Sequence, residues 1–308
     1  MARCFVTRRL PGHALARLAG EHEVDVWPQR LPPPPDELRA RVVEAEGLLC
    51  LLTDRVDGEL LDAAPRLRVV SNLAVGADNV DLEAARARGI RVGYTPDVLT
   101  ETTADLAFGL ILAIARRLPE GIEAVRRGEW LTWEPDWLLG RDVHGATLTI
   151  VGLGRIGRAV ARRAEGFGMR VLPAGRGQSL DDALARADYV SLHVPLTPDN
   201  RHLIGERELR RMQPSAYLIN TARGGVVDQD ALIRALREGW IAGAALDVTD
   251  PEPLPPDHPL LACPNLVVLP HLGSATHTAR ERMAELAVDN LLAGLAGRPL
   301  PHEAGVAD

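Results

Sequence analysis

Short apolar runs alternate with helical patterns through the first third of the 308-residue chain. Runs at 4–7, 23–27 and 47–52 have the length and apolar content of strands. Helical patterns lie between them, from His13 to Ala19 and from about Asp36. This alternation predicts a parallel sheet with crossover helices.

A second series of strand and helix patterns follows a helical stretch from Thr100 to Leu118. Its strand-like runs lie at 147–152, 169–172, 189–194, 216–220, 241–246 and 265–270. A final helical pattern, from about Thr278 to Ala296, has no strand after it and can cross back to the first domain. The chain length also favours two domains. We therefore predict that a domain formed by 1–98 and 279–308 is interrupted by a second domain, 99–278.

Composition limits the binding partners and the cellular compartment that the sequence predicts. The net charge of −7 and the absence of a basic block argue against nucleic acid and anionic membranes as partners. The three cysteines, Cys4, Cys50 and Cys263, are widely spaced in apolar stretches, which is typical of reduced core residues rather than disulfides or a metal site. Neither a secretory signal nor a membrane-spanning run is present in the sequence. We expect a cytoplasmic protein without a metal site.

The sequence contains no lysine, so all 35 basic residues are arginine. P-loop, Schiff-base and protein-kinase chemistry each require a lysine and are excluded. The Tyr-x-x-x-Lys proton relay of short-chain dehydrogenases is excluded for the same reason. If hydride transfer occurs, another residue must supply the proton.

A glycine-rich motif follows the strand-like run at 147–152. Gly152, Gly154 and Gly157 have the G-x-G-x-x-G spacing, and a helical pattern follows them. The first glycine permits a tight turn, the second lets the backbone approach a pyrophosphate, and the third lets the helix pack on the strand. The helix N-terminus adds free N–H groups for the phosphates. This context predicts a dinucleotide-binding site.

The next strand-like run, 169–172, indicates which dinucleotide is preferred. No acid follows it to bind the ribose 2′-hydroxyl of NAD; instead the chain continues through Pro173 to Arg176. An arginine there can pair with the 2′-phosphate of NADP, although it can also be an ordinary solvated loop residue. We favour NADP(H), with NAD(H) as the alternative.

Three charged residues follow later strand-like runs, at the sheet edge where parallel sheets bind ligands. Arg223 can bind a carboxylate through two parallel N–H donors, or form a structural salt bridge. His271 can donate a proton to a carbonyl oxygen, or be structural. Glu252 can fix the imidazole tautomer and stabilise its protonated form, or be an ordinary turn acid. Together they favour reduction of a 2-keto acid.

The chain resembles the D-isomer-specific 2-hydroxyacid dehydrogenases over nearly its whole length, and most closely their glyoxylate/hydroxypyruvate reductase branch. The matching stretches are SNLAVGADNVD at 71–81, TADLAFGLILAIARR at 103–117, VGLGRIG at 151–157, NTARGGVVDQDAL at 220–232, ALDVTDPEPLPPDHPLL at 245–261 and LPHLGSATHTAR at 269–280. Several long motifs in the same order make the resemblance specific. It implies an α/β fold of two doubly wound parallel-sheet domains, with a dinucleotide-binding (Rossmann) domain inserted into a flavodoxin-like substrate domain.

The resemblance also implies roles for individual residues. Arg223, Glu252 and His271 form the catalytic triad, and the backbone of Val75 and Gly76 helps to bind the substrate carboxylate. Besides the glycines and Arg176, the implied cofactor contacts are Arg155, Ile156, Pro195, Thr221, Asp247, His271 and Gly273. The family forms homodimers through the helix matching Thr100–Arg117. Trp133 is the best match for a tryptophan that enters the partner's site, whereas Trp130 and Trp137 are expected at the interface or in the core.

This sequence departs from the family between Arg176 and Asp188, where it is about ten residues shorter than usual, as if a helical turn and a short strand on the adenosine side were lost. The expected reaction is NAD(P)H-dependent reduction of glyoxylate or hydroxypyruvate. Alternatives within the family are a bulkier keto acid, phosphoglycerate, formate or phosphite as substrate. An alternative of another class is a dinucleotide-sensing protein similar to the family's corepressors, although the chain lacks a long disordered tail.

Overall fold

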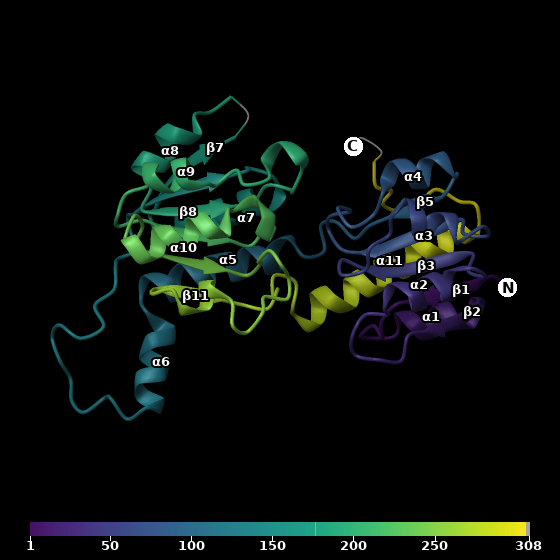
Figure 1. Ribbon diagram of the computed structural model, residues 1–308, viewed down its shortest axis with the longest axis horizontal. Coiled ribbons are helices and arrows are strands. Elements are labelled where there is room, and N and C mark those ends of the chain that lie inside the picture. Colours follow the sequence, from purple (N-terminus) through teal and green to yellow (C-terminus); the bar gives the residue numbers. More distant parts are fainter. Residues whose placement is uncertain (176, 306–308) are drawn as a thin grey trace. The chain divides into compact units, whose positions relative to one another are not determined.

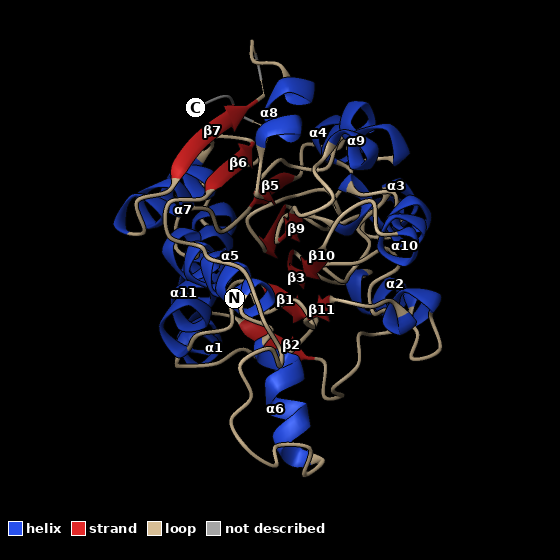
Figure 2. Cartoon of the chain, turned by 90° about the vertical axis from the view of Figure 1, so that its left-hand side faces the viewer, coloured by secondary structure: helices blue, strands red, loops and turns tan. Residues whose placement is uncertain are grey.

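The computed structural model describes residues 1–175 and 177–305, which form two compact units. Unit 1 comprises Met1–Leu99 and Ala275–Asp308, and unit 2 comprises Thr100–Ser274. Each unit contains one parallel sheet with helices on both faces (Figures 1 and 2). The predicted fold class is confirmed.

The sheet of unit 1 has five parallel strands in the order β2-β1-β3-β4-β5. These strands are β1 (Arg3–Val6), β2 (Glu23–Val26), β3 (Gly47–Leu51), β4 (Val69–Leu73) and β5 (Arg91–Gly93). The 2-1-3-4-5 order is that of flavodoxin-like folds, in which the strand order reverses between β1 and β3. Strand β4 is buried at every position, as expected for a central strand covered on both faces.

Helices cover both faces of this sheet. They are α1 (Ala14–Glu21), α2 (Pro35–Val42), α3 (Gly58–Asp62), α4 (Leu82–Ala87) and α11 (His277–Leu295). The C-terminal helix α11 packs on β3, β4 and β5, and the Ser71 hydroxyl donates to the Ala287 carbonyl at 2.7 Å. The final helix therefore returns to the first sheet.

The sheet of unit 2 has six parallel strands in the order β11-β10-β9-β8-β6-β7. They are β6 (Thr147–Val151), β7 (Arg170–Ala174), β8 (Tyr189–Leu192), β9 (Tyr217–Asn220), β10 (Gly243–Leu246) and β11 (Leu266–Val268). All six predicted strand-like runs form strands. The strand order reverses between β6 and β8, which is where such sheets bind ligands. Within the described residues β7 lies at one edge of this sheet and β11 at the other. A short connection leads from β7 to α8 (Leu180–Arg186).

Two layers of helices sandwich this sheet. On one face, α5 (Thr100–Ala115) and α7 (Arg155–Gly166) form a core with residues such as Ile111, Leu148 and Ile150. On the other face, α8, α9 (Glu206–Arg211) and α10 (Gln229–Glu238) form a second core around Leu192, Leu218 and Leu232. The apolar strands are buried by both layers, which explains their near-continuous hydrophobic runs.

The helix predicted to reach Leu118 ends earlier. Helix α5 stops at Ala115, Arg117 adopts a left-handed conformation with φ 53°, and a separate helix α6 (Leu118–Arg126) begins. Pro119 sits in the first turn of α6, where a missing N–H costs nothing, but it could not continue α5. Figures 1 and 2 show α6 and the loop after it projecting from the body of unit 2.

No helix in the described part of the chain combines the length and the apolar character needed to cross a membrane.

Candidate active site

The glycine motif forms the turn between β6 and α7. Gly152 has φ +93°, and a Cβ there would lie 2.7 Å from the His193 carbonyl oxygen. A Cβ on Gly157 would lie 2.3 Å from the Gly152 oxygen, so only glycine lets α7 pack this closely on the turn. In contrast, a Cβ on Gly154 would meet no atom within 4 Å, and this residue forms the N-cap of α7. Open space therefore faces the N-terminus of α7.

The surroundings of this turn fit a dinucleotide. The first-turn N–H groups of α7 have no intrahelical acceptors and can bind a pyrophosphate. Arg155 and Ile156 open the helix, and Pro195 follows the neighbouring strand β8. Thr221, just beyond β9, is buried, and its hydroxyl oxygen lacks a hydrogen-bond partner within the described residues. An unpaired buried hydroxyl is what a polar ligand group would satisfy.

Arg223 lies in a rigid turn after β9. The Asn220 side chain accepts from the Ala222 N–H at 3.0 Å and donates to the Arg223 carbonyl at 2.9 Å. A Cβ on Gly224 would lie 2.0 Å from the Thr249 carbonyl carbon. Because Gly224 has no side chain, the Arg223 turn packs directly on the segment after β10 that leads to Glu252.

Glu252 and His271 form a close pair. Glu252 Oε1 lies 2.5 Å from Nδ1 of His271, and both side chains are partly exposed, at 34% and 22% of their surfaces. With the proton on Nδ1, the Glu252 carboxylate accepts a hydrogen bond from Nδ1–H, so Nε2 is the nitrogen left for other partners. Thr249 N–H also donates to the carboxylate, at 3.5 Å. Glu252, from the segment after β10, and His271, from the turn after β11, thus form one hydrogen-bonded pair.

Asp247 holds the turn that carries His271. Its carboxylate accepts from the N–H groups of Leu272 at 2.7 Å and Gly273 at 2.8 Å, and its carbonyl accepts from His271 N–H at 2.9 Å. His271 has φ +57°, an uncommon value for a residue with a side chain. Burial raises the pKa of Asp247, and the two backbone donors oppose this shift. The uncommon backbone conformation of His271 is therefore stabilised by specific hydrogen bonds.

A second histidine lies near the glycine turn. His193 follows β8, and its Nε2 lies 2.8 Å from the Ser191 hydroxyl oxygen. Burial lowers the pKa of His193 from 6.5 to about 4, because the charged imidazolium is poorly solvated there. This imidazole is neutral at physiological pH.

The structure gathers most of the predicted site residues at one edge of the unit 2 sheet. Arg223, Glu252 and His271 follow the adjacent strands β9, β10 and β11, and the glycine turn follows β6. Val75 and Gly76 belong to unit 1, in the loop after β4. Trp133 is 81% exposed in the loop after α6, and Arg176 lies outside the described residues.

Sequence reasoning did not identify Asn220 or His193 as parts of this edge. Asn220 is the last residue of β9, and an Asn at a strand end before a glycine-containing turn is a usable signal for a side chain that caps the turn. His193 gave no comparable signal, because its burial depends on tertiary packing. Among the described residues no group of His, Cys, Asp or Glu side chains is arranged to hold a metal ion.

Comparison with known proteins places this arrangement in a family. Residues 108–273 match the model of the D-isomer specific 2-hydroxyacid dehydrogenase NAD binding domain. The chain is 50% identical to the glyoxylate reductase of Korarchaeum cryptofilum, over 97% of this chain and 95% of that protein. The crystal structure of a Thermus thermophilus protein is 53% identical and superposes with a TM-score of 0.94, covering 98% of this chain and 99% of the other.

A further solved relative was crystallised with ligands. It is the NADPH-dependent glyoxylate/hydroxypyruvate reductase of Sinorhizobium meliloti in complex with NADP and malonate, 33% identical with a TM-score of 0.85, over 99% of this chain and 97% of the other. The fold and the site define an oxidoreductase that uses a nicotinamide dinucleotide. The chain belongs to the D-isomer-specific 2-hydroxyacid dehydrogenase family, as the sequence predicted.

Proposed function

We propose that this enzyme reduces glyoxylate or hydroxypyruvate to the corresponding 2-hydroxy acid. The observation that carries the proposal is the 2.5 Å contact between Glu252 and His271, made at the sheet edge beside the Arg223 turn. The Korarchaeum relative is a glyoxylate reductase and the Sinorhizobium relative is a glyoxylate/hydroxypyruvate reductase, and both activities support this substrate class. The reduced nicotinamide supplies a hydride to the keto carbon.

His271 donates the proton that the reaction needs. As hydride reaches the carbon, negative charge develops on the keto oxygen, and a proton from Nε2 of His271 neutralises it. Glu252 at Nδ1 stabilises the charged imidazolium before the transfer and fixes its tautomer. In the reverse direction the neutral imidazole accepts the hydroxyl proton.

Arg223 binds the substrate carboxylate through its guanidinium. The backbone N–H groups of Val75 and Gly76 also bind a carboxylate oxygen, as the family resemblance implies. Binding the carboxylate at several points orients the keto carbon for hydride transfer and distinguishes 2-keto acids from simple aldehydes.

The preferred cofactor is NADPH. Strand β7 ends at Ala174 without an acidic side chain, so no carboxylate is available there to bind a ribose 2′-hydroxyl. Arg176 follows two positions later in the sequence and offers a positive charge for the 2′-phosphate. The Sinorhizobium relative carries NADPH dependence in its name.

The test is to follow the loss of reduced-nicotinamide absorbance with glyoxylate and hydroxypyruvate, using NADPH and NADH separately. We expect turnover of at least one keto acid, faster with NADPH, and a loss of at least roughly a hundredfold in His271→Gln. If the enzyme turned over only a bulkier keto acid, phosphoglycerate, formate or phosphite, the family would stand but its substrate would be that compound instead. Tight NADPH binding without any turnover would favour a sensing protein.

We also propose that two copies of the chain associate through the helix that the family resemblance implies, Thr100–Arg117, and that α6 and the loop after it extend this interface. Leu118, Ile122 and Val125 lie on one face of α6 and are each at least half exposed. The adjoining loop exposes Leu131 and Trp133 to more than 80%. Apolar side chains gathered in this way mark a protein-binding surface. In the dimer, Trp133 reaches the partner's site, as the family resemblance implies.

Light scattering after size exclusion tests the dimer. We expect the wild type to elute as a dimer and Ile122→Glu to elute as a monomer, because a buried unpaired charge opposes association. A monomeric wild type would refute the interface. Trp133→Ala should remain dimeric but raise KM, and an unchanged KM would exclude Trp133 from the site.

A further inference from the structure

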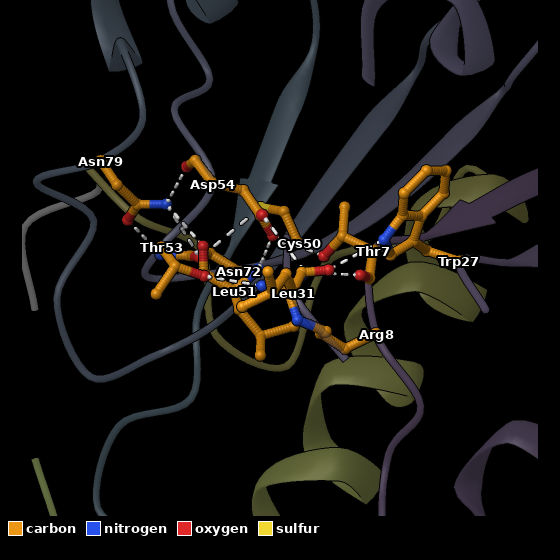
Figure 3. Close-up of polar contacts among 10 residues, drawn as sticks. All are labelled: Thr7, Arg8, Trp27, Leu31, Cys50, Leu51, Thr53, Asp54, Asn72 and Asn79. Atoms are coloured by element: carbon orange, nitrogen blue, oxygen red, sulfur yellow. Dashed lines mark hydrogen bonds and ion pairs between the residues drawn. The ribbon is translucent and has the colours of Figure 1, made fainter. Parts of the chain in front are cut away.

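A polar cluster lies at the carboxyl ends of β1, β3 and β4 in unit 1 (Figure 3). Thr7 and Asp54 are buried beside each other, and the Thr7 hydroxyl donates to Asp54 Oδ2 at 2.5 Å. The same oxygen accepts from Leu51 N–H at 2.8 Å, and Arg8 Nη1 lies 3.8 Å from Oδ1. Two hydrogen bonds at Oδ2 and the Arg8 guanidinium near Oδ1 thus offset the burial of the Asp54 carboxyl group.

Two asparagine side chains connect this cluster to the 74–79 loop. The Asn79 amide group donates to the carbonyl oxygens of Leu51 at 3.0 Å and Asp54 at 2.9 Å. Asn72 and Asn79 also bond to each other in both directions, at 2.8 and 3.3 Å. We call these two side chains the amide pair. Through it, the ends of β3 and β4 are tied together.

The amide pair also reaches the loop directly. The Asn72 amide group donates to the Gly76 carbonyl at 3.0 Å. Its oxygen is further contacted by the thiol of buried Cys50 at 3.5 Å, and burial raises the pKa of that thiol well above its usual range, so the proton stays on sulfur. The Asn72 side chain is fully buried and held on both ends. It therefore fixes the orientation of the Gly76 peptide.

The loop held in this way has unused donors. Its first residue is fixed by two backbone bonds, from Ala74 N–H to Asn72 and from Thr95 N–H to Ala74. Across the described ranges, by contrast, the N–H groups of Val75 and Gly76 donate to no backbone carbonyl, and both residues are partly exposed. Consecutive backbone N–H groups in a turn, with no backbone acceptor of their own, can bind an anion.

We propose that Asn72 and Asn79 are positioning residues that hold the 74–79 loop in the conformation in which Val75 and Gly76 N–H bind the substrate carboxylate. This inference rests on the proposed function. The amide pair does not contact the carboxylate. It acts through the Gly76 carbonyl, because holding this oxygen restricts rotation about Gly76 Cα relative to the preceding peptide plane, which carries the Gly76 N–H. The pair therefore sets substrate affinity and leaves the proton and hydride steps unchanged.

The experiment compares wild type, Asn79→Ala, Asn72→Ser and the double variant. For each we would measure KM and kcat with glyoxylate at saturating NADPH, the Kd of NADPH, and the Kd of oxalate for the NADPH-bound enzyme. Oxalate is a planar dicarboxylate that resembles the keto acid. Asn72→Ser provides a second route if Asn79→Ala does not fold, because it retains every donor of Asn79.

The matched control is Asp57→Ala. This substitution also removes a side-chain hydrogen bond in unit 1, the N-cap of α3 at 3.0 Å from Leu60 N–H, but it does not touch the 74–79 loop. It should lower the melting temperature without changing KM. The control separates general loosening of unit 1 from misplacement of the loop.

We expect KM for glyoxylate and Kd for oxalate to rise together by roughly tenfold to a hundredfold in each single variant, the scale of one hydrogen bond to a charged group. The kcat should stay within about threefold of wild type. In the double variant, KM and the Kd of oxalate should rise no further than in the single variant with the larger effect. Unchanged KM and oxalate affinity, or a fall in kcat alone, would overturn the proposal. A wild type that reduces neither keto acid but binds oxalate would refute the proposed function only, and oxalate affinity would then decide the positioning role. A wild type that neither reduces a keto acid nor binds oxalate would refute both.

Discussion

The Nδ1 atom of His271 lies 2.5 Å from Oε1 of Glu252, and the two residues follow adjacent parallel strands, β11 and β10. The position of His271 depends on Asp247, which accepts from two backbone N–H groups of the same turn. The position of the imidazole is thus set by the carboxyl ends of β10 and β11 and by the buried carboxylate of Asp247.

Glu252→Gln tests whether the charge at this contact matters. The amide keeps the size of the side chain but loses the charge that stabilises the imidazolium, so kcat should fall by roughly tenfold to a hundredfold. The Kd of NADPH should not change. Because the two residues act as one unit, Glu252→Gln should add little to His271→Gln in the double variant. Multiplicative losses in steady-state kinetics would show that the residues act independently.

Arg223→Lys tests the carboxylate contact. Lysine retains the positive charge but loses the two parallel donors, so KM for the keto acid should rise by about tenfold or more while kcat changes less. Initial-rate measurements over a range of glyoxylate concentrations would detect this. An unchanged KM would indicate a structural role for the arginine.

Gly224→Ala tests the packing of the Arg223 turn. The added Cβ would lie 2.0 Å from the Thr249 carbonyl, so the turn must move away from the segment that leads to Glu252. We expect a lower melting temperature and a raised KM. Gly166→Ala, at the end of α7, is the control, because its Cβ would meet no atom within 4 Å. Wild-type KM and melting temperature in Gly224→Ala would contradict the packing argument.

His193 predicts a pH dependence of stability. Its pKa falls from 6.5 to about 4 on folding, so between these values the unfolded chain binds a proton that the folded chain does not. Stability is therefore complete above pH 6.5 and declines as the pH falls towards 4. Allowing for partial exposure of the ring, the unfolding free energy should drop by about 1–2 kcal/mol between pH 8 and pH 5.

His193→Gln should reduce this dependence, because glutamine does not titrate. Urea unfolding of both proteins at pH 8 and pH 5 measures the difference. The same decline in both would assign the pH dependence to other groups.

The positions of the strands and of the glycine turn could be read from the sequence, because each depends on neighbouring residues. Apolar runs buried on both faces specify the strands of unit 2, and Gly152 and Gly157 are required by close contacts at the β6–α7 turn. Arg223, Glu252 and His271 could be predicted at one edge because parallel strands end at the same edge of a sheet.

Contacts between distant segments were decided only by the tertiary structure. The uncommon φ of His271 depends on Asp247, which lies 24 positions earlier in the sequence. The low pKa of His193 arises from burial in the folded chain. The amide pair joins the ends of β3 and β4 through side chains that carry no local signal. Local sequence determines which elements form, whereas burial and long-range hydrogen bonds determine how their polar groups are held.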